Sequence, residues 1–170
     1  MVFIDEAGFY LLPMAVRTYA PVRQTPILSE TLTRDHRSVI GAVTADGRLY
    51  LRGADRALSS KDVVRFMGHL QQHLGRKLLV IWDGAPIHYG EVKTFLAEGG
   101  AADIHLERLP AYAPDLNPVE GIWRYLKHVE LSNICCENLD QVWYELRKAA
   151  ARLRHKPEII QGCVRQPGCY

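Results

Sequence analysis

The sequence has no apolar run long enough to cross a membrane. Its first residues, MVFIDEAGF, carry two acids where a secretory signal needs a basic segment and then an apolar one. It also contains no internal repeat, no low-complexity tract and no linker that would divide it. We therefore expect a single domain over residues 1–170, in the cytoplasm, with no membrane partner.

Cysteine and excess charge are also scarce. The four cysteines, Cys135, Cys136, Cys163 and Cys169, have no CxxC spacing and no histidine placed to complete a tetrahedral zinc site. The formal net charge of +2 is too small to indicate a nucleic-acid-binding protein by itself. Residues 147–156, RKAAARLRHK, hold five Lys/Arg and no acid, which fits either a phosphate-binding surface or an ordinary solvated helix face.

The composition that remains, 48% hydrophobic and 24% charged residues, is typical of a soluble globular protein. Residues 2–4 predict a short buried strand that ends at Asp5, followed by an irregular stretch with three prolines. The segments SVIGAVT and RLYLRG flank Asp46-Gly47, a pair that tolerates the positive φ angles of a two-residue hairpin turn. These segments predict an antiparallel meander.

From Ser60 the apolar period becomes helical, with apolar residues at 63, 66, 67, 70 and 74 and Ser59 or Ser60 as the N-cap. KLLVIWDG then predicts a strand covered on both faces that ends at Asp83. Further patterns predict a helix near 89–98, a strand around residues 104–106, and helices near 118–130 and 138–155. This order predicts an α/β fold, a mixed sheet with helices on both faces.

Three carboxylates stand where ligands bind such sheets. The first and fourth strands can lie side by side and parallel, which brings Asp5 and Asp83 to one edge. Strand alternation puts Glu6 on the opposite face from Asp5. Glu120 has two readings: with Asn117 as N-cap it forms a capping box, or it faces the two aspartates from the rim of a helix that buries Ile122, Trp123, Leu126 and Val129.

Three converging carboxylates repel one another unless a cation lies between them. Mg²⁺ prefers oxygen ligands and retains waters and phosphate oxygens, so a site with few protein carboxylates suits it. Two such ions can activate a nucleophile and stabilise a leaving oxygen in phosphoryl displacement. The residues thus indicate metal-dependent nuclease chemistry.

Four ordered motifs carry a family resemblance: FIDEAGF, RTYAPVRQTP, VIWDGAPIH and LPAYAPDLNPVEGIWRYLK. Together they resemble the catalytic domain of IS630-type transposases of the Tc1/mariner superfamily. The resemblance implies a ribonuclease-H-like fold and a DDE triad, Asp5, Asp83 and Glu120, that binds Mg²⁺ or Mn²⁺, two ions in all. It implies cleavage of DNA at transposon ends and strand transfer into target DNA.

The chain departs from that family in two ways. Tyr19 and Arg23 stand where the family more often has tryptophan and glycine. The first catalytic strand is predicted to begin at residue 2, so we expect this chain to lack the upstream helix-turn-helix region of the family. We therefore expect end recognition to need a separate or frameshift-fused polypeptide, and we expect a homodimer on paired DNA ends.

Other residues have weaker assignments. His88 and Tyr112 could contact DNA, whereas Asp115 and Asn117 are expected to build the turn that aims Glu120. A ribonuclease H proper is disfavoured because residues 63–74 contain no acid. The rival of another class is a non-catalytic remnant that acts at most as a DNA-binding or dimerisation module.

Overall fold

The protein forms one five-stranded sheet with helices on both faces. The computed structural model describes residues 1–28, 33–83, 92, 94–95, 103–110 and 113–165. The strands are β1 (Val2–Tyr10), β2 (His36–Thr44), β3 (Leu49–Ala54), β4 (Leu78–Trp82) and β5 (Ile104–Arg108). Their order in the sheet is β3-β2-β1-β4-β5.

The pairing is antiparallel in one half of the sheet and parallel in the other. β1, β2 and β3 form the predicted antiparallel meander, and β1, β4 and β5 pair in parallel. The prediction that β1 ends at Asp5 is wrong, because the strand continues to Tyr10. Residues 5–10 pair with β2 over their whole length, so the partner strand extends β1 beyond its apolar start.

The β2–β3 hairpin uses its glycine differently from the prediction. Gly47 has a φ of +83°, but Asp46 does not have a positive φ. The backbone N–H of Gly47 donates to the carbonyl of Thr44, and the N–H of Thr44 donates to the carbonyl of Arg48. The connection is therefore a longer turn with one left-handed residue instead of a two-residue turn.

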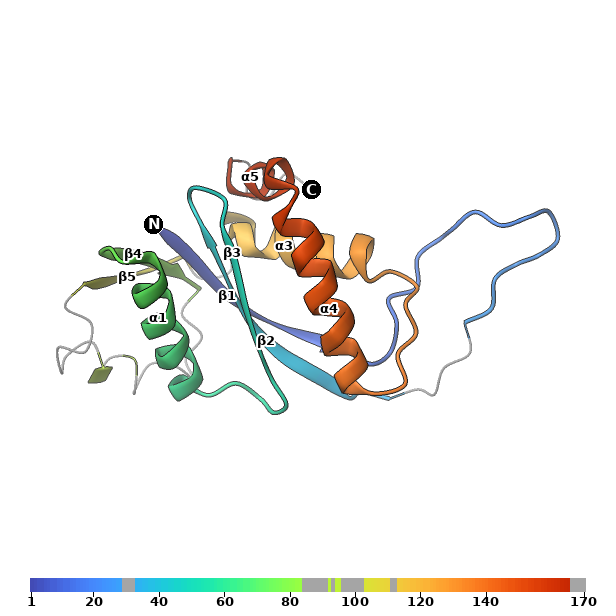
Figure 1. Cartoon of the computed structure of the whole chain (residues 1–170), viewed down its shortest axis with the longest axis horizontal. Coiled ribbons are helices and arrows are strands. Elements are labelled where there is room, and N and C mark those ends of the chain that lie inside the picture. Colours follow the sequence, from blue (N-terminus) through green and yellow to red (C-terminus); the bar gives the residue numbers. More distant parts are fainter. Residues whose placement is uncertain (29–32, 84–91, 93, 96–102, 111–112, 166–170) are drawn as a thin grey trace.

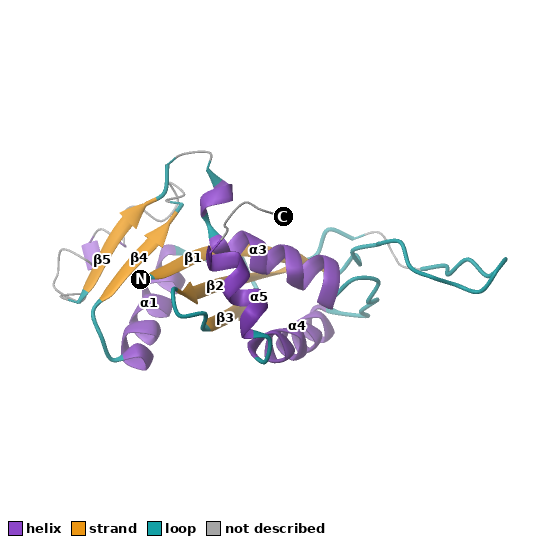
Figure 2. Cartoon of the chain, turned by 90° about the horizontal axis from the view of Figure 1, so that it is seen from above, coloured by secondary structure: helices purple, strands orange, loops and turns teal. Residues whose placement is uncertain are grey.

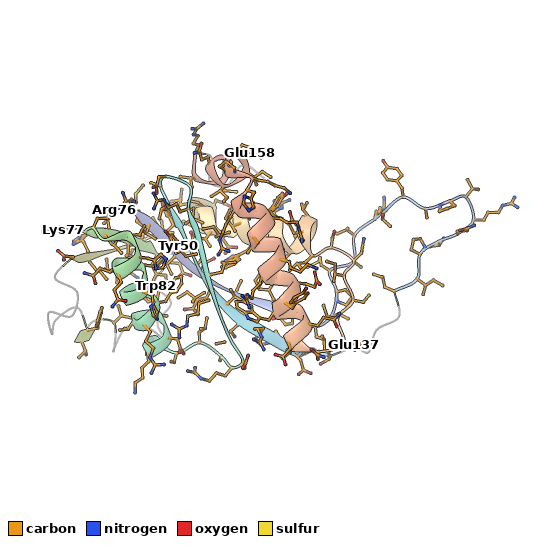
Figure 3. The ribbon with its side chains drawn as sticks, viewed as in Figure 1. Tyr50, Arg76, Lys77, Trp82, Glu137 and Glu158 are labelled. Atoms are coloured by element: carbon orange, nitrogen blue, oxygen red, sulfur yellow. The ribbon has the colours of Figure 1, made fainter. Side chains whose placement is uncertain are left out.

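Helix α1 (Ser60–Leu74) covers one face of the sheet. It begins at the N-cap Ser59, whose backbone N–H donates to Asp62, and it ends at Gly75 with a φ of +59°. Its apolar side packs on the strands in a core that Tyr50 and Trp82 join from β3 and β4 (Figure 3). Figure 1 shows α1 and the C-terminal helices on opposite sides of the sheet, as predicted.

Three helices cover the other face. They are α3 (Pro118–Tyr125), which continues into the π-helical turn η3 (Leu126–Glu130), then α4 (Leu139–Arg154) and α5 (Pro157–Arg165). The predictions near 118–130 and 138–155 are confirmed, whereas α5 was not predicted. Val129, expected to be buried, is 57% exposed because the wider π-helical turn shifts the helical phase.

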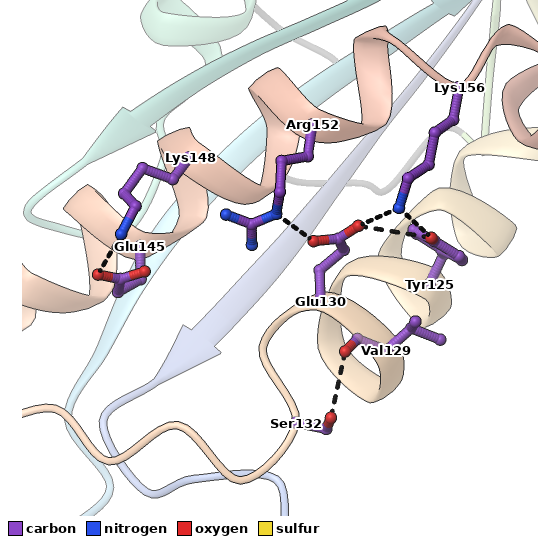
Figure 4. Close-up of polar contacts among 8 residues, drawn as sticks. All are labelled: Tyr125, Val129, Glu130, Ser132, Glu145, Lys148, Arg152 and Lys156. Atoms are coloured by element: carbon purple, nitrogen blue, oxygen red, sulfur yellow. Dashed lines mark hydrogen bonds and ion pairs between the residues drawn. The ribbon is translucent and has the colours of Figure 1, made fainter.

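The phase shift turns Glu130 inward instead of Val129. Its carboxylate accepts from Arg152 Nε at 2.7 Å and from Lys156 Nζ at 2.9 Å (Figure 4). Lys156 also donates to the hydroxyl of Tyr125. This network joins η3 to the end of α4 and the start of α5.

The cover over β4 and the segment after β1 both differ from a simple layered arrangement. One face of β4 is incompletely covered, since Leu79 is 36% exposed and Ile81 on the same face is only partly buried, so the prediction of a strand buried on both faces is wrong. Residues 17–28 extend away from the sheet as an arm (Figures 1 and 2). In that arm Arg23 has a φ of +66°, and the N–H of Gln24 donates to the carbonyl of Pro21.

The arm turn explains the glycine of the family pattern, not the arginine that this chain has instead. A four-residue turn with a positive φ at its third position favours glycine there, which is the residue the family more often has where this chain has Arg23. No helix in the described part of the chain has the length and apolar character of a membrane span.

Candidate active site

The sheet register places Asp5 and Asp83 next to each other. Ile4 on β1 pairs with Trp82 on β4, and the strands run parallel, so the next residue of each is Asp5 and Asp83. β4 ends at Trp82, whereas β1 continues. Asp5 therefore lies within a strand and is 6% exposed, while Asp83 lies just beyond a strand end and is exposed.

Helix α3 brings the third carboxylate to this edge. Asn117 is its N-cap, and the side-chain oxygen accepts from the backbone N–H of Val119 at 3.2 Å. The Asn117 amide also makes a long hydrogen bond, 3.5 Å, to the carbonyl of Ile4. Because Ile4 precedes Asp5, the same buried residue fixes the start of α3 and joins it to the strand that carries the first aspartate.

Only one of the two hydrogen bonds of the predicted capping box is present. Asn117 caps the helix, but among the described residues no hydrogen bond returns from the Glu120 carboxylate to the cap. In α1, by contrast, Asp62 at the equivalent position does bond the N-cap backbone. The Glu120 side chain is exposed and therefore available to a ligand.

Trp123 holds the Asp5 carboxylate. Its indole Nε1–H donates to Asp5 Oδ2 at 2.8 Å, and its ring packs edge-on against Phe9. The sequence predicted Trp123 as a core residue, and it is buried at 2% exposure, but the bond to Asp5 was missed. Trp123 follows Glu120 by one helical turn, and only this spacing could have suggested the bond to Asp5.

The negative charges at this edge affect the pKa of Asp5 and that of Glu120. Burial, together with the charges of Glu120 and Asp83, raises the pKa of Asp5 from 3.8 to about 7, although hydrogen bonds from the Glu6 backbone and from Trp123 lower it. Burial also raises the pKa of Glu120, with a contribution from Asp83, while Lys127 opposes the shift. The site is thus a cluster of negative charge that is costly to ionise.

An all-oxygen, mutually repelling donor set fits a hard divalent cation. Within the described residues, however, no three His, Cys, Asp or Glu side chains are grouped closely enough to hold a metal ion. Asp5, Asp83 and Glu120 are neighbours at one sheet edge but do not form a closed coordination shell. Binding of a cation would need rotations of these side chains, and the exposed Asp83 and Glu120 have the space to make them.

The structure describes two of the four remaining predicted site residues, Asp115 and Asn117. His88 and Tyr112 lie outside the described residues. Asp115 is exposed in the short helix η2 (Pro114–Leu116), and Asn117 is the buried cap already described. Helix α1 does contain an acid, Asp62, just before the range 63–74 used to disfavour a ribonuclease H, but Asp62 is bound by Arg56 at 2.7 Å and by Ser59.

Solved structures share this fold. The chain is similar to the transposase chain of a Mos1 mariner paired end complex with Mn (TM-score 0.65, 19% identity) and of a Mos1 strand transfer complex (TM-score 0.63, 19% identity), covering 99% of this chain and 56% and 55% of those chains. It is also similar to the Mos1 transposase catalytic domain with Raltegravir and Mn (TM-score 0.62, 16% identity, 99% of this chain and 83% of that one). The predicted ribonuclease-H-like fold is confirmed.

The chain corresponds to different shares of the length of these relatives. The chain spans just over half the length of the transposase chains in the two Mos1 complexes. No curated protein matches the sequence. One protein family does, the DDE superfamily endonucleases, whose sequence model matches residues 1–142. Since this match covers most of the chain, the protein belongs to the DDE superfamily of endonucleases.

Proposed function

We propose that the chain is the catalytic domain of a Tc1/mariner-type transposase that cleaves and joins DNA phosphodiesters. The observation that carries the proposal is the gathering of carboxylates from β1, the end of β4 and the start of α3 at one sheet edge, where the charges of Glu120 and Asp83 raise the pKa of Asp5. The family match and the likeness in fold to the Mos1 catalytic domain support it.

In this proposal Asp5, Asp83 and Glu120 bind two Mg²⁺ or Mn²⁺ ions. The similar Mos1 complexes with Mn and with Mg support the choice of cation. When bound, the cations supply activation of the oxygen nucleophile and stabilisation of the leaving oxygen. The protein contributes position: Trp123 orients Asp5, and the Asn117 cap holds the helix that carries Glu120.

The substrates and partners belong to the same proposal. The Mos1 structures are paired end and strand transfer complexes, so we assign DNA ends and target DNA as substrates and a homodimer as the assembly. End recognition by a separate or frameshift-fused helix-turn-helix portion would complete it. The IS630 subgroup rests on the motif resemblance.

The test is a Mn²⁺-dependent nicking assay on supercoiled plasmid. The wild-type chain should nick, and Glu120→Gln should reduce the rate by at least about 10²-fold, because it removes a ligand and a charge. Glu158→Gln, which changes an exposed glutamate on α5 (Figure 3), is the matched control and should keep the wild-type rate. Equal rates for Glu120→Gln and the wild type would remove Glu120 from catalysis and favour the non-catalytic remnant.

A further inference from the structure

Resting on the proposed function, we propose that the outer side of α4 binds the phosphate backbone of duplex DNA at a second place, next to the edge strand β3 and apart from the carboxylates. The basic run over residues 147–156 supplies the cations. The sequence allows two roles for this run, a phosphate-binding surface or a solvated helix face, and the structure favours the first.

A groove of about 420 Å³ lies between α4 and β3. Helix α4 packs on β2 and β3, and β3 is the edge strand farthest from β5 (Figure 2). Because β2 separates β3 from β1, this groove lies to one side of Asp5 and Asp83. We call it the α4 groove, and its lining includes Leu51 of β3 and, from α4, Trp143, Tyr144, Arg147, Ala151 and Arg154.

The cations of the α4 groove stand on one side of the helix. Arg147, Ala151 and Arg154 are spaced by four and then three residues, which puts them on one helical face. Both arginines are exposed. They are about 10 Å apart along the helix axis, or about three nucleotide steps of one DNA strand. The short side chain of Ala151 lets a ligand approach the helix between them, so the face fits a row of anions.

The two arginines differ from the other cations of the basic run in having no counterion. Within the described residues, the ion pairs of this run are made by Lys148, Arg152 and Lys156, and neither Arg147 nor Arg154 pairs with a carboxylate. Their charge therefore faces solvent without internal compensation. Such a charge attracts a polyanion and gains from the counterions that the polyanion releases.

Two contacts organise the ends of the α4 groove. Arg154 Nε donates to the carbonyl of Leu49 at 3.0 Å, and a guanidinium has further N–H donors for a ligand. At the other end Tyr144 is 60% exposed, and its ring centroid lies 5.0 Å from Lys148 Nζ. Arginine and tyrosine side chains both bond phosphate oxygens in protein–DNA interfaces. Groups that are held before binding lose less conformational entropy when a phosphate arrives.

Another occupant with matching charge is an acidic peptide that pairs as an extra strand with the open edge of β3. The placement of the cations favours DNA, because they follow the axis of α4 on its exposed side, whereas an added strand would lie along the backbone of β3. Arg154 also bonds the Leu49 carbonyl with which β3 begins, so that acceptor is already used.

The experiment measures binding of a short fluorescein-labelled DNA duplex by anisotropy, without divalent metal, over a range of KCl concentrations. Arg147→Gln should weaken binding roughly 5- to 10-fold at about 0.1 M KCl and reduce the steepness of log K against log salt by about 0.9, the value for one phosphate contact. The double variant Arg147→Gln/Arg154→Gln should reduce it by about 1.8. Arg147→Lys keeps the charge and should keep the wild-type slope.

Arg65→Gln is the matched control. Arg65 is 63% exposed on α1, which covers the other face of the sheet (Figure 1), so its replacement removes the same charge from a different surface. This variant should keep the wild-type slope. Equal losses for Arg65→Gln and Arg147→Gln would overturn the proposal, because the chain would then bind DNA through its overall charge.

Wild-type affinity and slope in Arg147→Gln would also overturn the proposal. A labelled glutamate-rich peptide tests the other occupant: if its binding needs Arg147 and that of the duplex does not, the α4 groove takes an acidic strand. Arg147→Gln breaks no ion pair within the described residues, so it should fold as the wild type does. Failure of the proposed function is distinguishable, because the binding assay needs no cleavage. A normal Arg147 effect with an active Glu120→Gln variant would retain the α4 groove and remove the catalytic triad.

Discussion

Two inward-facing acids near α3 and η3 have opposite surroundings. Asp5 is buried beside the exposed Asp83 and Glu120, and burial and these charges raise its pKa to about 7. The Glu130 side chain is 7% exposed but lies between two cations. Burial alone would raise the pKa of Glu130, but hydrogen bonds from Lys156 and Arg152 outweigh burial and lower it.

The difference separates a structural acid from a functional one. Glu130 has its counterions within the chain, so its charge stabilises the fold. Asp5 accepts hydrogen bonds from neutral donors, Trp123 and the Glu6 backbone, and it lies near the like charges of Glu120 and Asp83, so its charge costs folding free energy. Such a cost is typical of a site whose charge is balanced by a ligand from outside the chain.

The largest change in the free energy of unfolding is expected for Asp5→Asn, which removes the charge that Glu130 keeps. The pKa of Asp5 is about 7 in the folded protein and near 3.8 when unfolded, so the folded state binds more protons between these values. Wild-type stability therefore falls as pH rises from about 4 to 7. Asparagine stays neutral and still accepts from Trp123, so the variant should gain on the order of 3 kcal/mol above pH 7.

Urea unfolding at several pH values without divalent metal would measure this gain. The difference between Asp5→Asn and the wild type should vanish well below pH 3.8, where Asp5 is neutral in both states. Saturating Mn²⁺ at pH 8 should stabilise the wild type and leave the variant unchanged, since the variant lacks one proposed ligand. A pH-independent difference would show that the charge of Asp5 is not the cause.

A smaller effect of opposite sign is expected for Glu130→Ala. The change leaves Arg152 and Lys156 without their shared carboxylate, and both cations are held between helices (Figure 4). Because these cations are 45% and 40% exposed, water compensates in part, and we expect a loss of about 2 kcal/mol instead of the larger cost of a fully buried pair.

The matched control for this prediction is Glu145→Ala. Glu145 pairs with Lys148 at 3.1 Å along the same helix, α4, without joining two elements. Its removal should change the free energy of unfolding by no more than about 0.5 kcal/mol. If both variants lose the same free energy of unfolding in urea, then joining two elements adds no stability to the Glu130 ion pairs. The contrast between Glu130 and Asp5 would then fail.

Much of the sheet could be predicted from the sequence because strands and turns have local signals. Apolar runs predicted β1 and β4, and the alternation of apolar and polar residues predicted β5. The register that places Asp5 beside Asp83 follows from two parallel strands. The length of β1 could not be predicted in this way. Residues 5–10 are held by pairing with β2, a partner distant in the sequence.

The helices show the same limit. The N-cap and the proline of α3 predict where the helix starts. No sequence pattern predicts that α3 changes to a π-helix at Leu126. That change exposes Val129 and turns Glu130 inward. In the site, the acids were found because chemistry selects their residue types, whereas the bond from Trp123 to Asp5 depends on how α3 packs on β1 and β2.

Gly41 on β2 is the residue that permits this packing. It pairs with Asp5 across the strands, and a Cβ at this position would lie 2.4 Å from Cη2 of Trp123 and 3.0 Å from Leu51. Gly41→Ala should therefore push the indole away and cost about 1–2 kcal/mol, the range for overpacking a core, less a small gain from reduced chain entropy. Urea unfolding of the variant at pH 8 measures the loss.

Gly68→Ala in α1 is the control, because a Cβ there has no atom within 4 Å. That variant should gain up to about 1 kcal/mol from helix propensity. If the displaced indole releases Asp5, the hydrogen bond that lowers the pKa of Asp5 is lost, and the fall in stability should extend to a higher pH than in the wild type. An unchanged pH profile would mean that the hydrogen bond from Trp123 to Asp5 survives the displacement of the indole. Packing against Gly41 would then not position the carboxylate.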